Sequence, residues 1–313
     1  MTPPTSAGRR PGGQPTKAVL RRRGMRRLRT TRGIVQLAFA ALIVTVGVRH
    51  QLLKSEAPSV DALCPFGGVE TLITWITTGQ FIGKIHPSNL ILGLAVLVAV
   101  VVAGNAFCGW VCPFGAGQDA LTWARRALHL PTVDLPRAAD RVLRWGRFVV
   151  LAVVLYFSVS TAKLWFAGFD PYLTLFSLHW LFAFDAATMW LPLAILAAIL
   201  GASVVVDRFW CRYLCPLGGV FAIVGHLSVF RVRRSASACT DCTLCDRPCP
   251  VGIEPSKAAP LASTDCIGCL DCVAACPVKG ALSLDGPVAL GMPLRRDAAA
   301  ASAPRRAGTK VSS

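Results

Sequence analysis

The sequence predicts an α-helical membrane protein that carries a small, cysteine-rich α+β domain near its C-terminus. Of the 313 residues, 54% are hydrophobic and only 16% are charged, whereas soluble domains carry about a quarter charged residues. The apolar residues gather in four runs, and eight of the 13 cysteines fall between residues 239 and 276. Composition therefore separates a lipid-embedded part from a compact cysteine-rich part.

The four apolar runs are each close to the length that crosses the roughly 30 Å hydrocarbon core of a membrane as a helix. Their interiors lack the polar stripe of an amphipathic helix on a soluble core. Arg49 and His50 interrupt only the end of the first run. The sequence predicts four transmembrane helices, at residues 33–53, 89–107, 148–167 and 189–206.

The basic residues predict how these helices are oriented. Residues 1–32 carry ten Lys or Arg and no acidic residue, whereas residues 169–188 carry no Lys or Arg. Arginines also follow the second and fourth runs. By the positive-inside rule, both termini and twelve of the 13 cysteines lie on the cytoplasmic side of the cell membrane. Thiols stay reduced there and bind metals, so disulfides are not expected.

The net charge of +17 is explained by this orientation and by attraction to anionic membrane lipid. Nucleic-acid binding is the rival explanation, and no nucleic-acid partner is expected. The two tails, residues 1–32 and 287–313, are rich in Pro, Gly, Ala, Ser and Arg. Such segments bury too little apolar surface to fold, so both tails are predicted to be disordered.

Two copies of the motif C-x2-C-x2-C-x3-C-P occupy residues 239–250 and 266–277. This is the cysteine spacing of bacterial two-cluster ferredoxins, in which the fourth cysteine of each run binds the other cluster. Structural zinc is the alternative, but zinc favours two separated C-x2-C pairs. We therefore expect a cytoplasmic ferredoxin-like domain over residues 231–286 with two [4Fe–4S] clusters. One cluster would be held by Cys239, Cys242, Cys245 and Cys276, and the other by Cys249, Cys266, Cys269 and Cys272.

The membrane part is predicted to be two parallel repeats, residues 33–130 and 131–230. Each repeat has an apolar run, an outer loop, a second apolar run and a C-x3-C-P motif followed by an interfacial stretch. In the outer loops, Cys64-Pro65 of the first repeat corresponds to Asp170-Pro171 of the second.

The two C-x3-C-P motifs are expected to form a third site. In a helix, cysteines at positions i and i+4 lie on one face, and two such pairs can meet across the axis that relates the repeats. The site could hold a third cluster or a soft metal such as Cu(I). Dithiol redox chemistry and simple packing of the repeat interface are the alternatives. The residues concerned are Cys108, Cys112, Cys211 and Cys215.

The outer loops contain other candidate residues. Their aromatic side chains could wall a quinone head group or simply anchor the loops in the interface. His179 and Asp170 are candidate proton acceptors at such a site, with ordinary interface polarity as the alternative. Cys64 could bind a partner, a metal or a cofactor, or simply pack. Haem bound by paired histidines is a further alternative, although only His50 lies near an apolar run.

The segments FCGWVCPFGAGQD and FWCRYLCPLGG follow apolar runs and precede the two-cluster domain. In this combination the chain resembles the NapH/NosR/CcoG-type membrane polyferredoxins over about residues 33–285. The resemblance implies quinol oxidation that feeds a periplasmic reductase, electron supply for reductase maturation, or copper handling during oxidase assembly. The chain departs from the nitrous-oxide-linked members, which have an N-terminal flavin-binding domain, and from the oxidase-assembly members, which have an extra C-terminal domain.

We therefore expect an iron–sulfur protein of the cell membrane that relays electrons between the quinone pool and a redox partner of unknown identity. It could be the electron-transfer subunit of a quinol dehydrogenase, and no catalytic residue is predicted. One alternative is an assembly factor that handles redox chemistry or copper. Another is a redox-responsive regulator of a respiratory enzyme.

Overall fold

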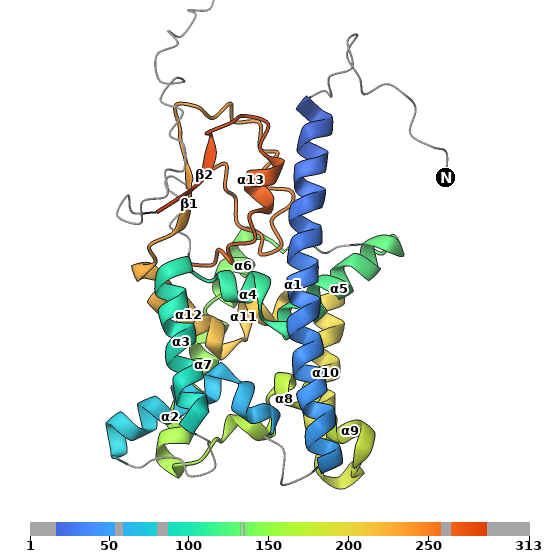
Figure 1. Ribbon diagram of the computed structural model, residues 1–313, viewed down its shortest axis with the longest axis vertical. Coiled ribbons are helices and arrows are strands. Elements are labelled where there is room, and N and C mark those ends of the chain that lie inside the picture. The colour runs from blue at the N-terminus through green and yellow to red at the C-terminus, as the bar shows by residue number, and fades with distance from the viewer. Residues whose placement is uncertain are drawn as a thin grey trace, which may run out of the picture.

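The computed structural model describes residues 17–53, 59–79, 87–131, 133, 135–257 and 264–286. These residues are mostly helical and include one two-stranded sheet (Figure 1). The second predicted tail, 287–313, and the first 16 residues of the other lie outside the described residues. Residues 17–32, which were expected to be disordered, instead form the beginning of α1 (Lys17–Leu53). The reason is tertiary, because arginines in this part of α1 contact the cysteine-rich module described below.

Three of the four predicted runs form helices that are long and apolar enough to cross a membrane. They lie in α1, in α6 and α7 together (Arg137–Leu143 and Gly146–Thr161), and in α10 (Ala186–Val205). The second run forms α3 (Pro87–Ala103), which is apolar but only 17 residues long. It ends early because Gly104 turns the chain with a φ of +64°. The count of four spans and the two-repeat arrangement stay predictions.

Four shorter helices share one way of starting. Each begins at a proline, and the residue before that proline has an extended backbone and forms the N-cap. Proline suits the first position of a helix and keeps the preceding residue extended. The four helices are α2 (Pro65–Thr78), α5 (Pro113–Ala127), α8 (Pro171–Phe176) and α12 (Pro216–Val224).

Short helical segments connect these elements. They are η2 (Val60–Leu63), α4 (Ala106–Trp110), η3 (Phe166–Gly168), α9 (His179–Phe182), α11 (Phe209–Tyr213) and η4 (Gly225–Leu227). A buried apolar cluster that includes Phe66, Phe114, Phe166 and Trp210 lies where the proline-initiated helices begin. Edge-to-face ring pairs join Phe66 to Phe166 and Phe114 to Trp210.

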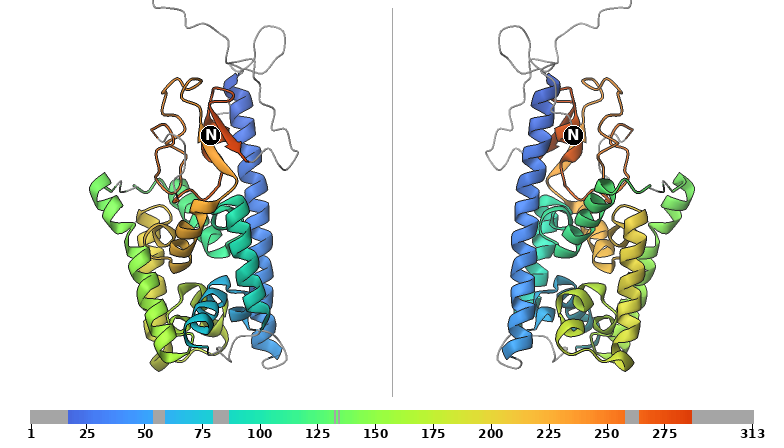
Figure 2. Two further views of the ribbon diagram at one scale, coloured as in Figure 1. Left: turned by 90° about the vertical axis from the view of Figure 1, so that its left-hand side faces the viewer. Right: turned by 90° about the vertical axis from the view of Figure 1, so that its right-hand side faces the viewer.

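Residues 231–286 form a cysteine-rich module at one end of the helical part (Figures 1 and 2). Strand β1 (Arg231–Arg234) pairs antiparallel with β2 (Leu282–Asp285), with Val232 opposite Leu284. The loops between the strands carry the eight clustered cysteines and one short helix, α13 (Asp271–Ala275). The first part of α1 runs alongside this module, whereas α2 and α9 lie at the far end of the molecule (Figure 1).

Candidate functional site

The first predicted quartet of ligands lies around one small pocket of the module. Cys239, Cys242, Cys245 and Cys276 line it together with residues such as Arg234. Cys276 belongs to the second motif and reaches this pocket as the extended C-cap residue of α13. We call this site the distal pocket.

The second predicted quartet lines a separate pocket, which we call the proximal pocket. Its walls are mostly apolar and include Val232, Val251 and Ile267. The fourth cysteine of the first motif reaches this pocket, so the two motifs exchange their last cysteines. The four thiols are those of Cys249, Cys266, Cys269 and Cys272.

The thiols in these pockets suit iron–sulfur ligation. Burial raises the pKa of Cys269 and of Cys245 to about 11 and also raises the pKa of Cys266. Iron must therefore displace protons when it binds, which couples cluster binding to pH. No three His, Cys, Asp or Glu residues among the described residues lie close enough to hold one metal ion. A [4Fe–4S] cluster does not need its thiolates to meet at one ion, because each of the four thiolates binds a different iron atom.

The proximal pocket lies against the first C-x3-C-P segment. Cys108 packs against the cluster formed by Val251, Ile267 and Cys269. A Cβ atom on Gly109 would lie only 2.4 Å from the backbone oxygen of Ile267, so the two backbones are in close contact. The close approach places the two cysteine sites next to each other.

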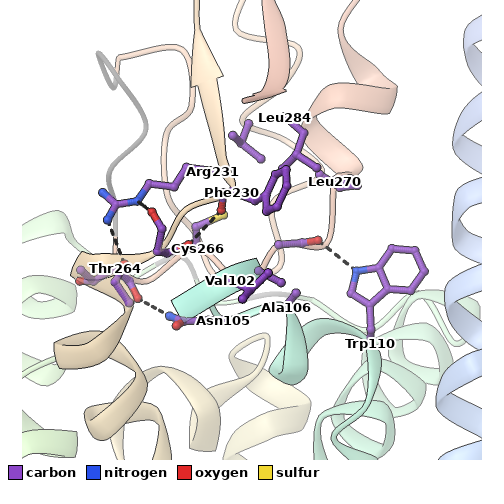
Figure 3. Close-up of a pocket in the computed structure, with 16 residues that line it drawn as sticks. Val102, Asn105, Ala106, Trp110, Phe230, Arg231, Thr264, Cys266, Leu270 and Leu284 are labelled. Carbon is purple, nitrogen blue, oxygen red and sulfur yellow. Dashed lines mark hydrogen bonds between the residues drawn. The ribbon is translucent and has the colours of Figure 1, made fainter. Parts of the chain in front are cut away.

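A cavity of about 370 Å³ lies at this junction between the module and the helices (Figure 3). Trp110 Nε1 donates a hydrogen bond to the backbone oxygen of Gly268 at 3.0 Å, and Asn105 Nδ2 donates to that of Thr264 at 2.6 Å. Both bonds hold the loop that carries Cys266, which also lines the cavity. The helical part thus fixes the position of residues 264–268, which we call the proximal loop because its Cys266 lines the proximal pocket.

Ion pairs hold the module to the helices from two sides. Arg147 Nη2 lies 2.5 Å from a carboxylate oxygen of Asp265, and Arg144 lies 2.8 Å from the other oxygen. Arg29 and Arg32 of α1 both contact Asp271 at 3.3 Å. Some of the arginines that predict membrane orientation therefore also bind acidic residues of the module.

The four C-x3-C-P cysteines line one cavity of about 250 Å³ within the helical part. The expectation that the two motifs meet thus agrees with their positions. The same cavity is also lined by Cys64 and Asp170, which were expected to lie in the outer loops. We call this cavity the thiol chamber; its cysteines are Cys64, Cys108, Cys112, Cys211 and Cys215.

The thiol chamber is where the four proline-initiated helices begin. Their N-cap residues are Cys64, Cys112, Asp170 and Cys215. The backbone N–H of Gly218 donates to the Cys215 sulfur at 3.4 Å. The N-terminus of a helix carries positive partial charge and free N–H groups, so it favours thiolates and other anions. In the sequence each of these four N-cap residues is followed by a proline. That shared pattern was the signal by which Cys64 and Asp170 could have been grouped with the C-x3-C-P cysteines.

A buried charge pair supports the wall of the chamber on the module side. Arg208 is fully buried; its guanidinium donates to both carboxylate oxygens of Asp119, at 2.8 and 2.6 Å. It also donates to the backbone oxygen of Cys108 at 3.0 Å. Next to Asp119, Gln118 donates to the sulfur of Cys211 at 3.4 Å. Neither Arg208 nor Asp119 was singled out from the sequence.

Of the two proton acceptors considered from the sequence, only Asp170 lies in the chamber. His179 is exposed at the start of α9 and is not among the residues that line the chamber. His50 also lies at the far end of α1, outside that lining.

Comparison with known protein families gives two matches. A 4Fe-4S binding domain matches residues 85–131 and 188–235, which include the two C-x3-C-P segments. A 4Fe-4S dicluster domain matches residues 231–284, the cysteine-rich module. No solved structure matches the chain significantly.

Several proteins have related sequences. The Escherichia coli protein YccM is 30% identical over 74% of this chain and 65% of its own length. An uncharacterized protein of Methanocaldococcus jannaschii is 30% identical over 71% of this chain and 85% of its own. The ferredoxin-type protein NapH of Haemophilus influenzae is 28% identical over 65% of this chain and 71% of its own length. The chain thus spans just under two thirds of YccM, and only 27% of the Paracoccus denitrificans protein NirI.

Proposed function

The chain belongs to the NapH/NosR-type family of iron–sulfur electron-transfer proteins, and we propose that it relays electrons between the quinone pool and a protein redox partner. The observation that carries this proposal is the adjacency of the proximal pocket and the thiol chamber through Cys108. Four thiols line each of the two module pockets, and a further five line the chamber. Such a series of sites suits movement of single electrons.

The residues that would hold the two [4Fe–4S] clusters are the cysteines of the distal and proximal pockets. When bound, each cluster supplies one-electron oxidation and reduction at a potential set by its surroundings. The chain itself contributes the position and environment of the thiols. The apolar wall of the proximal pocket excludes water, and Trp110 and Asn105 keep its loop against α4.

We further propose that the helical part is embedded in the cell membrane, with the module and both termini on the cytoplasmic side. Support comes from three long apolar helices, from the shorter apolar α3, and from arginines gathered at the module end. In this arrangement residues 33–130 and 131–230 are the two parallel repeats. Residues 231–286 are the cytoplasmic ferredoxin-like domain.

The thiol chamber is the proposed meeting point with quinone. Its lining is mainly apolar, and two of its side chains, Phe39 and Leu42 of α1, are also exposed on the outside of the helical part. Leu42 is 52% exposed although it lines the chamber. An apolar cavity whose wall is exposed in this way suits entry of a lipid-soluble ring from the side.

The test uses the full-length protein, purified without oxygen in detergent and reduced with dithionite. Decylubiquinone is added, and oxidation of the iron–sulfur chromophore is followed by visible absorbance and EPR. We expect reoxidation within seconds and its loss on bulky substitution of the chamber wall, Val96→Trp. Reducible clusters that do not react with the quinone would overturn the quinone coupling.

A second candidate function is the handling of a soft metal such as Cu(I). The observation that favours it is that five thiols line one cavity, because thiolates select Cu(I) over harder ions. Since no three of these thiols lie close enough to hold one ion, a Cu(I) ion there would be bound by two of them. The double substitution of Cys108 and Cys211 by Ser separates the two functions. Loss of bound copper, measured by mass spectrometry after Cu(I) loading, with quinone-linked turnover intact would favour metal handling. Loss of turnover in a protein that binds no copper would favour the relay.

A further inference from the structure

The outer half of the helical part contains two buried carboxyl groups that electron transfer alone does not require. We propose that Asp170 and Glu70 form a proton relay, which carries protons from a quinol in the thiol chamber to the far end of the protein. This inference rests on the proposed quinone coupling and adds the path of the protons to it.

Asp170 is the chamber end of the relay. It is only 6% exposed and lines the chamber. One carboxylate oxygen accepts a hydrogen bond from the backbone N–H of Tyr172 at 2.9 Å, which fixes the side chain as the N-cap of α8. Asp170 is also the only carboxylate among the described residues that line the chamber. Among these residues, Asp170 is therefore the carboxylate that could accept a proton from a quinol hydroxyl in the chamber.

Glu70 lies behind the chamber wall on α2. It is 2% exposed, and the hydroxyl of Ser158 on α7 donates to its carboxylate at 2.6 Å. It lies one helical turn after Phe66 on α2, and Phe66 lines the chamber together with Asp170. No Lys or Arg forms an ion pair with Glu70 within the described part of the chain. A buried carboxyl without a cation is costly to maintain in an apolar setting, and within membrane proteins such groups mark proton pathways.

Helix α2 continues the path away from the chamber. Phe66, Glu70, Thr74 and Thr78 are spaced by four residues and so lie along one face of the helix. Phe66 lines the chamber, Glu70 and Thr74 are buried, and Thr78 is exposed. The hydroxyl of Thr74 is buried and has no hydrogen-bond partner among the described residues. A water molecule bridging from such a hydroxyl would complete a polar path.

Figure 1 shows α2 at the end of the molecule opposite the module. The path therefore leads away from the cysteine pockets. Protons and electrons released in the chamber would leave in opposite directions.

When a quinol becomes a quinone, two O–H bonds break and two protons are released. The two electrons go to the two [4Fe–4S] clusters that the cysteines of the distal and proximal pockets would hold, one electron to each. Asp170 accepts each proton in turn as a carboxylate and becomes a neutral carboxylic acid. It then passes the proton to Glu70, from which it leaves along the polar face of α2 to water. In quinone reduction the same groups would supply protons from the far end.

The test is made with the full-length protein reconstituted into liposomes that contain a trapped pH-sensitive dye. Decylubiquinol is added without oxygen, while cluster reduction and lumenal pH are followed together in the vesicles that face the module outward. We expect Glu70→Gln to slow cluster reduction by roughly 10²-fold, a usual effect of losing a proton-transfer group, and to abolish acidification of the lumen. Its dithionite-reduced EPR spectrum should match that of the unsubstituted protein.

The matched control is Asp185→Asn, which also removes a carboxylate but lies outside the chamber lining. Asp185 caps α10 at an exposed position, and Asn caps helices equally well. Glu70→Asp keeps a carboxyl group and should recover part of the rate, which distinguishes proton transfer from a folding defect. Lumenal acidification that persists in a folded Glu70→Gln protein would overturn the relay alone. Failure of decylubiquinol to reduce the unsubstituted protein would overturn the quinone coupling and the relay with it.

Discussion

Arg32 Nη1 on α1 lies 3.3 Å from Asp271 Oδ2 at the start of α13, although the two residues are 239 positions apart in the sequence. Arg29 contacts the same carboxylate, and a second nitrogen of Arg32 lies 3.5 Å from Asp119 on α5. Arg32 is therefore shared between the module and the helical part. This pairing explains why α1 continues as a helix beside the module.

Asp271→Asn should destabilise the contact between α1 and the module. The substitution leaves Arg32 buried and without one of its two carboxylate partners, and breaking a buried ion pair costs about 3–5 kcal/mol. The measurement is the unfolding temperature in detergent, together with protease sensitivity of the module. Glu254→Gln is the control, because it removes an exposed ion pair with Arg137 and should change little. Equal effects of the two substitutions would contradict this role of Asp271.

Exchange of the last cysteine between the two motifs can be tested by comparing single substitutions. Cys276→Ser should resemble Cys242→Ser, because both remove a thiol from the distal pocket. Cys249→Ser should resemble Cys269→Ser, because both thiols belong to the proximal pocket. Each variant is expected to fall from about eight to about four iron atoms per chain.

EPR of the remaining cluster provides the comparison for these cysteine variants. The spectra should fall into two groups, one for each pocket. If Cys276→Ser instead matched Cys269→Ser, the cysteines would not be exchanged and the assignment of the pockets would be wrong.

Gly109→Ala should separate α4 from the proximal loop. The added Cβ would lie 2.4 Å from the backbone oxygen of Ile267, and overpacking of this kind costs about 1–3 kcal/mol. We expect a lower unfolding temperature and slower reoxidation by decylubiquinone, with the iron content unchanged. Gly117→Ala is the matched control on α5, because no atom lies within 4 Å of its added Cβ. A Gly109→Ala protein with normal reoxidation would show that this close contact is not needed for the relay.

Asp119 should make the stability of the protein depend on acid pH. Burial alone would raise the pKa of Asp119, but the charges of Arg208 and Arg32 outweigh burial and hold it below its usual range. A carboxyl group with a lowered folded-state pKa contributes stability above its unfolded pKa of about 4. This contribution is lost as the pH falls through that value toward the folded pKa.

The corresponding experiment compares the unsubstituted protein with Asp119→Asn. At pH 7 the variant should unfold at a lower temperature, because Arg208 loses its carboxylate partner. The difference between the two proteins should shrink below about pH 4. A difference that stays constant from pH 7 to pH 3 would rule out ionisation of Asp119 as the source of the stability.

The cysteine-rich iron–sulfur module could be predicted because the information in its cysteine spacing is local. In each motif the first three thiols are two residues apart, so a short loop can bring them to one pocket in almost any fold. The proline after each fourth cysteine directs that residue away, and Cys249 and Cys276 do line the opposite pockets. Helices at the apolar runs could also be predicted from the sequence. Helix α3 is shorter than its run, because Gly104 turns the chain after Ala103.

The thiol chamber could be predicted only in part. The two C-x3-C-P motifs were expected to meet because they are similar and are placed alike along the chain. Cys64 and Asp170 looked remote, since both lie in loops at the far ends of apolar runs. Their helices start inside the molecule instead, so that all four X-Pro N-caps reach one cavity.

The sequence by itself determined the family of the protein, its iron–sulfur module and three long apolar helices, because thiol spacing and hydropathy are properties of short segments. Tertiary structure alone decided that Arg32 meets Asp271, that Arg208 is buried against Asp119, and that Ser158 of α7 donates to Glu70 of α2. Those relationships join residues from separate helices. They depend on how the helices pack, and short-range patterns along a single chain do not specify that packing.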